Sequence, residues 1–175
     1  MKKTLFVFVL AAIVAMMASC SGSGNNSKTI TATGTEFETG QVSKFIELVS
    51  QSTELTYTEK NDYQYLRFTL TLKLVRDGIK DVDARDIGFI RYLGVLGVEL
   101  VDESGSRITT VELRNEDDLK FKKFLTGNEG DTAEFVFEYK FGNAEMAQQE
   151  FKEAVQFTPA LASDIVVNDV AYVMP

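Results

Sequence analysis

The segment Leu66-Arg67-Phe68-Thr69-Leu70-Thr71-Leu72-Lys73-Leu74 alternates without exception between apolar and polar side chains. Because successive side chains along a β-strand point to opposite faces, this spacing places five apolar residues on one face and four polar residues on the other. A strand of this kind packs one face on a core and exposes the other to water, as in antiparallel sheets. The segment therefore predicts a half-buried antiparallel strand.

Residues 132–141 repeat the alternation, with Phe135, Phe137, Tyr139 and Phe141 on one face. Aromatic rings at every second position of a strand are typical of a protein core rather than of a ligand slot. Shorter segments rich in β-forming residues predict further strands at 29–37, 45–49, 55–59, 95–101, 107–113 and 165–173.

Two short helices are expected between these strands. Asn115 is followed by acidic residues at 116–118, in the first turn of a helix, where the helix dipole favours negative charge. A second helix begins at Asn143 and ends before Pro159. Residues 28–175 are therefore predicted to form one mainly β domain, a two-sheet antiparallel sandwich with two short helices. The layout resembles immunoglobulin-like sandwiches in topology, without a shared motif.

The chain opens with Lys2 and Lys3 and continues with an apolar stretch over residues 5–18. This layout predicts an export signal at residues 1–19, because the stretch is shorter than the roughly 20 residues that a membrane-spanning helix needs. The following Met17-Ala18-Ser19-Cys20 resembles the lipobox of bacterial lipoproteins, with Met17 where Leu is usual. The resemblance implies a diacylglyceryl group on the Cys20 thiol, cleavage before Cys20 and acylation of the new amino terminus. The alternative is an ordinary secretory signal followed by an incidental cysteine.

After the lipidated Cys20, the small and polar residues up to position 27 predict a flexible tether between the lipid and the domain. In some lipoproteins of gut bacteria, an acidic cluster after the cysteine marks export to the outer surface. No such cluster follows Cys20. The resemblance therefore favours a cell-envelope protein that is anchored in the outer membrane and faces the periplasm.

Composition narrows the chemistry that the chain can perform. Without residues 1–19 it holds 16 basic and 26 acidic residues, a net charge of −10, which argues against nucleic acid as a partner. It has no histidine, and its one cysteine is Cys20, so the usual Ser-His-Asp and Cys-His mechanisms and Cys- or His-ligated metals are excluded. Carboxylate chemistry, oxygen-ligated cations and binding without catalysis remain, and no cofactor is implied.

Tyr57, Tyr63, Tyr65 and Arg67 gather around the first predicted hairpin. Tyr63, Tyr65 and Arg67 share the polar face of their strand, and Tyr and Arg are enriched where proteins bind partners. These four residues are the candidate partner surface. The alternative is an ordinary strand with favourable cross-strand pairs.

Asp81, Asp83 and Asp86 form a weak candidate for a cation site. A calcium loop needs an oxygen ligand at its fifth position, glycine at its sixth and glutamate at its twelfth. Counted from Asp81, these positions hold Arg85, Asp86 and Tyr92, so the pattern fails and an acidic surface loop is favoured.

Asp131-Thr132-Ala133 resembles the acceptor sequence of a bacterial O-glycosylation system that acts on exported proteins. The resemblance implies a glycan on Thr132. It requires Thr132 to stand at an exposed end of its strand.

Together these observations predict a lipid-anchored envelope protein that binds a partner and is not an enzyme. Two alternatives remain open: a carboxylate-dependent hydrolase of glycans or cell-wall material, and a lipoprotein that binds a small ligand or cation. The acidic residues at 116–118 are poor candidates for a hydrolytic pair, because neighbours on one helical turn do not face each other across a cleft.

Overall fold

The computed structural model describes residues 26–37, 40, 42–80, 82, 86–93, 96–161, 164–167 and 170–171. The predicted export signal, Cys20, Asp81 and Asp83 lie outside the described residues. The tether was expected to extend to residue 27, whereas the first strand already begins at Asn26.

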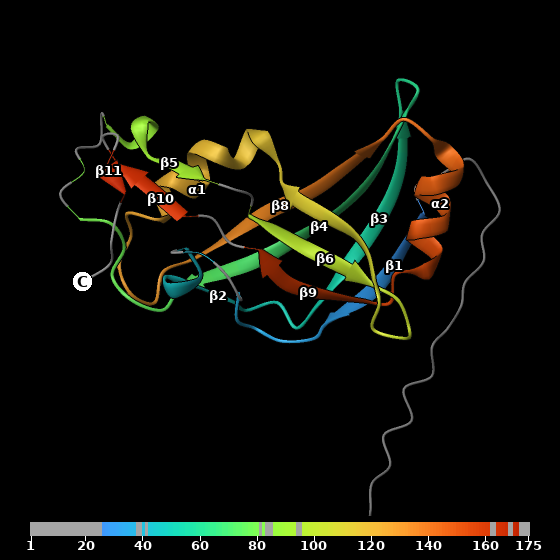
Figure 1. The fold of residues 1–175 in the computed structure, drawn as a ribbon, viewed down its shortest axis with the longest axis horizontal. Helices are drawn as coiled ribbons and strands as arrows, with labels where there is room; N and C mark the ends of the chain where they lie inside the picture. The colour runs from blue at the N-terminus through green and yellow to red at the C-terminus, as the bar shows by residue number, and fades with distance from the viewer. Residues whose placement is uncertain are drawn as a thin grey trace, which may run out of the picture.

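Seven strands of the described chain close into a barrel (Figure 1). They are β1 (Asn26–Ala32), β3 (Ser52–Lys60), β4 (Tyr63–Leu74), β6 (Gly97–Val101), β7 (Arg107–Leu113), β8 (Thr132–Phe141) and β9 (Gln156–Leu161). Their order around the barrel is β4-β3-β1-β9-β6-β7-β8 and back to β4. The β1–β9 pair is parallel, and the other pairs in the ring are antiparallel. A short strand, β2 (Ile46–Leu48), extends the sheet along the second half of β4.

The prediction of a two-sheet, immunoglobulin-like sandwich is wrong. The longest pairing in the molecule, between β4 and β8, runs from Gln64 opposite Phe141 to Lys73 opposite Thr132 and joins the two ends of the sheet. A sandwich leaves two edges on each sheet, whereas a closed barrel removes them. Alternation of apolar and polar residues occurs in both architectures, because strands in each turn one face toward a core.

Most of the predicted strands are present, and β7 and β8 have the expected bounds. The predicted strand 165–173 is divided into β10 (Asp164–Val167) and β11 (Val170–Ala171), which form a small separate sheet with β5 (Arg91–Leu93). The sequence did not predict β9, because Pro159 lies inside it. A register shift between β6 and β9 places Pro159 at an irregularity, one of the positions where a strand tolerates a residue without an N–H group.

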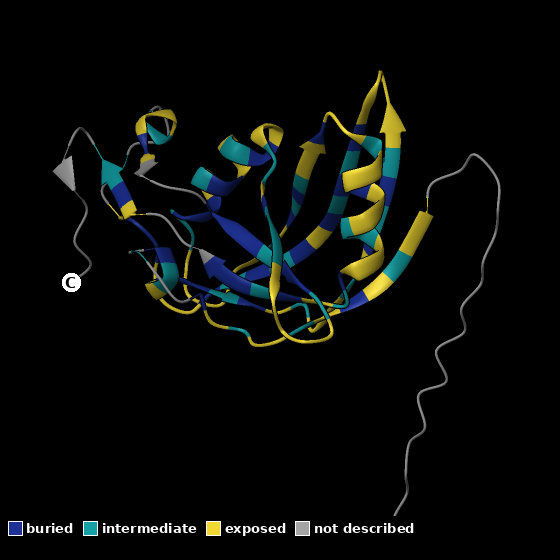
Figure 2. Cartoon of the chain, turned by 45° about the vertical axis from the view of Figure 1, so that its right-hand side comes forward, coloured by how far each residue is buried: buried dark blue, intermediate teal, exposed yellow. Residues whose placement is uncertain are grey.

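The apolar faces of the strands fill the barrel (Figure 2). Phe68 of β4 stacks on Phe137 of β8 with ring centroids 5.9 Å apart, and it contacts Phe157 of β9 at the same distance. The prediction that the aromatic face of residues 132–141 is core is confirmed for Phe135, Phe137 and Phe141.

Two α-helices pack on the barrel. α1 (Asp118–Phe124) continues a 3-10 turn, η3 (Asn115–Asp117), and sets its phenylalanines edge-on against Phe135. α2 (Ala144–Glu153) follows Asn143, so the predicted start of this helix is confirmed. The Asn143 side chain caps it by accepting hydrogen bonds from the N–H groups of Glu145 and Met146 at 2.9 and 3.2 Å. No helix in the described part of the chain is long and apolar enough to cross a membrane.

The two ends of the barrel carry different elements (Figure 1). α2 and the β3–β4 turn lie at one end, whereas α1 and the small sheet of β5, β10 and β11 lie at the other. Two further 3-10 turns, η1 (Val42–Lys44) and η2 (Ile87–Phe89), precede β2 and β5.

Candidate binding face of the barrel

Three of the four predicted partner residues lie on the outside of β4. Tyr63, Tyr65 and Arg67 alternate with buried residues of the same strand. Tyr57 does not belong with them. It lies opposite Leu66 in the β3–β4 register, is buried, and packs its ring on Phe151 of α2 with centroids 6.0 Å apart.

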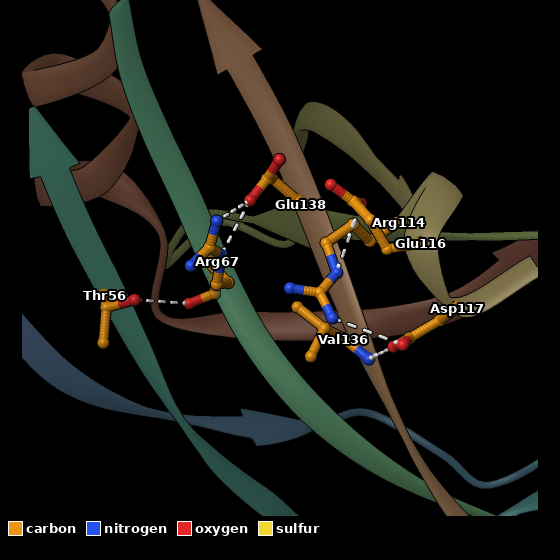
Figure 3. Close-up of polar contacts among 7 residues, drawn as sticks. All are labelled: Thr56, Arg67, Arg114, Glu116, Asp117, Val136 and Glu138. Atoms are coloured by element: carbon orange, nitrogen blue, oxygen red, sulfur yellow. Dashed lines mark hydrogen bonds and ion pairs between the residues drawn. The ribbon is translucent and has the colours of Figure 1, made fainter. Parts of the chain in front are cut away.

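A charged pair spans β4 and β8 at the middle of this surface (Figure 3). Arg67 and Glu138 are cross-strand neighbours, and the Nε of Arg67 donates to Oε2 of Glu138 at 2.7 Å while Nη2 contacts the same oxygen. On the other side of β4, the Thr56 hydroxyl donates to the Arg67 carbonyl oxygen at 3.0 Å. The two contacts with Glu138 hold the guanidinium in one orientation, and the Arg67 side chain is still more than a third exposed.

Lys140 of β8 occupies the next outward position and lies opposite Tyr65. Its ammonium group is 3.6 Å from the centroid of the Tyr63 ring, a cation–π contact. We name the residues Thr56, Tyr63, Tyr65, Arg67, Glu138 and Lys140 the outer β4 face. Within it one cation pairs with a carboxylate and the other covers an aromatic ring, so the face combines fixed polar groups with aromatic surface.

A second ion cluster lies beside this face, where β7 ends (Figure 3). Asp117 is 8% exposed, and its carboxylate accepts from the Val136 N–H at 2.7 Å and lies 3.3 Å from Nη2 of Arg114. The Arg114 N–H donates to the Val136 carbonyl. Both backbone groups of Val136 therefore point toward the edge of β8 that pairs with β7 up to Leu113, just beyond the last paired residue. Asp117 therefore supplies the acceptor that a continuing strand would have supplied.

The expectation that the helix dipole alone accounts for these acidic residues is wrong for Asp117. Its side chain makes no capping bond to α1 and serves the barrel wall instead. The sequence offered no signal for this role, because three consecutive acidic residues at a helix start look alike.

α2 turns the carboxylate of Glu150 toward the barrel. One of its oxygens, Oε2, is buried and has no hydrogen-bond partner. Burial raises the pKa of Glu150, the nearby charge of Glu153 acts in the same direction, and a hydrogen bond from Thr109 opposes both. Folding thus makes this carboxylate easier to protonate than in the unfolded chain.

Glu150→Gln is expected to stabilise the protein at pH 7–8 and to have no effect near pH 4. A carboxyl group with a raised pKa adds stability below its unfolded value of 4.5, and that stability is lost as the pH rises through the folded pKa. Glutamine removes the charged form, so the melting temperature should rise at neutral pH. The gain in the free energy of unfolding should stay below about 1 kcal/mol, because the group is partly solvated. Thermal melts from pH 4 to 8 measure this, with Glu145→Gln on the exposed side of α2 as the control. A gain that is constant with pH would contradict the assignment.

Asp86 is the described member of the candidate cation site. It precedes η2 and makes no side-chain capping bond there. Among the residues that the structure describes, no group of three or more Asp, Glu, His or Cys side chains is arranged to hold a metal ion.

Thr132, the candidate glycosylation site, is the first residue of β8 and is exposed. The preceding turn is held by Asp131, whose carboxylate accepts from the Asn128 N–H at 2.8 Å. The position meets the requirement for an exposed strand end.

A hollow of about 400 Å³ lies between α2 and the β6–β7 turn. It is lined by Asp102, Glu103, Ser104, Lys152, Glu153 and Val155. Hydrogen bonds from Ser104 and from the Ser106 backbone lower the pKa of Asp102. A general acid for glycoside cleavage needs a raised pKa, so Asp102 is unsuited to that role.

No protein-family model, curated protein or solved structure matches the chain. The fold and the outer β4 face define it as a small, mostly antiparallel β-barrel domain that displays a polar and aromatic strand surface. Its function is therefore argued from its own residues.

Proposed function

We propose that this protein is anchored by lipid on Cys20 in the bacterial cell envelope and acts there as a non-catalytic binding or accessory domain. The observation that carries the proposal is the amino-terminal sequence, in which two lysines and an apolar stretch lead directly into Met17-Ala18-Ser19-Cys20. Cys20 is the chain's one cysteine and stands where a lipobox requires it. The absence of an acidic cluster after Cys20 favours the periplasmic side of the outer membrane.

Acylation of Cys20 would hold the protein on the membrane. Each buried methylene contributes about 0.8 kcal/mol, and one acyl chain alone binds only marginally. The two or three chains that the lipobox resemblance implies would make the attachment effectively permanent.

The partner surface in this proposal is the outer β4 face. Tyr and Arg dominate binding hot spots because they bury large areas with few rotatable bonds. Arg67 is already held by Glu138, and the Tyr63 ring by Lys140, so docking would cost little side-chain entropy. The face holds two cations, Arg67 and Lys140, and one carboxylate, Glu138, so it is not acidic although the chain as a whole is.

The anchor is tested by mass spectrometry of the native protein's amino-terminal peptide after purification from membranes. The expected peptide begins at Cys20 and carries a diacylglyceryl group and an amide-linked acyl chain. A mature terminus at another residue, or an unmodified cysteine, would refute the anchor.

The partner surface is tested by placing a photo-crosslinking amino acid at Tyr65 in living cells. We expect one envelope protein to be crosslinked reproducibly from this position and the yield to fall at least about tenfold when Arg67→Ala removes the central side chain, as for a hot-spot residue. The control position is Arg107, an exposed residue at the start of β7. Equal products from both positions would count against the outer β4 face.

A further inference from the structure

The chain enters the barrel at a defined end. β1 runs antiparallel to β3, and its first residue, Asn26, lies opposite Tyr57 in a row that continues through Leu66 to Tyr139. The β3–β4 turn at Asn61 and Asp62 lies just beyond this row, and α2 begins beside it (Figure 1). We name this region the turn end: it comprises the β3–β4 turn, the adjoining ends of β4 and β8, and the first turn of α2.

Chain length brings the turn end close to the anchor. Six residue steps separate Cys20 from Asn26, and a fully extended chain of that length spans about 20 Å. From the row of Asn26 to Tyr63 the barrel extends three residues, about 10 Å, whereas the whole of β4, at 12 residues, is about 40 Å long. A lipid on Cys20 can therefore reach past the turn end but not past the opposite end.

The turn end exposes the side chains that suit a lipid headgroup layer. Large apolar side chains there are Tyr63, Tyr139 and Met146, which are 42%, 37% and 53% exposed. Lys60 pairs with Tyr63 across the turn, and Lys140 covers its ring. Aromatic rings with a polar tip and lysines with a long apolar stem are the side chains that partition to membrane interfaces.

Acidic groups at the same end decide which lipids fit. Glu59, Asp62 and Glu145 are exposed beside these residues. With two lysines against three carboxylates, this end lacks the excess of basic residues that binds anionic lipid, so it suits zwitterionic headgroups better.

We propose that the turn end rests on the headgroup layer of the membrane that holds the Cys20 anchor, with Tyr63, Tyr139 and Met146 at the interface. The inference rests on the proposed lipid anchor. It places α1, η2 and the small sheet on the side away from the membrane. It leaves Tyr65, Arg67 and Glu138 of the outer β4 face free along the wall of the barrel, while Tyr63 lies at the membrane edge of that face.

The test uses the absence of tryptophan and the single cysteine of the chain. The mature chain, beginning at Cys20, is coupled through its thiol to a maleimide-bearing lipid in phosphatidylcholine vesicles that contain acyl chains brominated near the headgroup. Met146→Trp and Tyr63→Trp each introduce one fluorophore at the turn end. Phe89→Trp, at a position 65% exposed near β5 at the opposite end, is the matched control.

We expect the brominated lipid to quench most of the fluorescence of the Met146→Trp and Tyr63→Trp variants and to leave that of Phe89→Trp unchanged. Equal quenching of all three, or none at the turn end, would overturn the proposal. The three substitutions are at exposed positions, and circular dichroism confirms folding before coupling. The coupling to lipid in this test is chemical and does not depend on acylation in the cell. If mass spectrometry showed native Cys20 without lipid, the proposed anchor would be refuted, but the quenching would still report which end of the barrel meets the membrane.

Discussion

Cys20→Ser is expected to abolish fatty-acid labelling and, once the export signal has been cleaved, to move the protein from the membrane fraction to the soluble part of the envelope. The diacylglyceryl group forms a thioether with the cysteine sulfur, and a serine hydroxyl does not replace the thiol in the lipoprotein pathway that the lipobox resemblance implies. The loss of two or three acyl chains, at about 0.8 kcal/mol for each buried methylene, removes essentially all of the membrane affinity. Fractionation after a high-salt wash, together with incorporation of labelled fatty acid, measures the change.

Ser21→Ala is the matched control, because it alters the residue next to Cys20 and leaves the thiol intact. It should remain in the membrane fraction. An uncleaved export signal could also retain the Cys20→Ser protein, so a second chain carries an ordinary secretory signal in place of residues 1–19 together with Cys20→Ser. If that chain stays membrane-bound after cleavage, the lipid anchor is refuted.

Asp117→Ala is expected to lower the free energy of unfolding by about 2–3 kcal/mol. The substitution leaves the buried Val136 N–H without an acceptor and Arg114 without its partially buried counter-ion, and each loss carries a desolvation cost. Urea denaturation at pH 7 measures the change as a lower midpoint with an unchanged slope.

Glu116→Ala provides the control for Asp117. Its side chain is 74% exposed and reaches the same arginine at 3.4 Å, so removing it should cost less than about 0.5 kcal/mol. Asp117→Asn keeps an oxygen acceptor for Val136 and should fall between the two. Equal effects of Asp117→Ala and Glu116→Ala would show that the buried bond to the barrel wall contributes nothing.

Local patterns predicted most of the elements. Alternation located β4 and β8, because it depends on one strand having a face toward water and a face toward the core. A short segment rich in β-forming residues located β7. The spacing of apolar residues after Asn143 located the start of α2, and the structure shows that the Asn143 side chain caps this helix. Pro159 hid β9, because the irregularity that accommodates it arises from pairing with β6.

The part of the candidate site that lies on a single strand was also predictable from the sequence. Alternation along β4 predicts that Tyr63, Tyr65 and Arg67 share the face turned away from the core, and the structure places them together on the outside. Alternation along β3 also places Tyr57 and Thr56 on opposite faces, so closeness in the chain to Tyr63 was a poor guide to where Tyr57 lies. The partners Glu138 and Lys140 come from a strand about 70 residues away, so only the register of β4 with β8 reveals them.

The sequence by itself determined which residues of β4 face the core, the ends of β7 and β8, the start of α2 and the acidic, histidine-free composition, because these depend on residue type and on spacing within one element. The lipid anchor is also argued from the sequence alone, and it stays a prediction. Only the tertiary structure decided that the sheet closes into a barrel, that Asp117 is buried and that Glu150 faces inward. Each of these depends on hydrogen bonds or burial between segments distant in the chain, and alternation within a strand carries no information about which strand lies beside it.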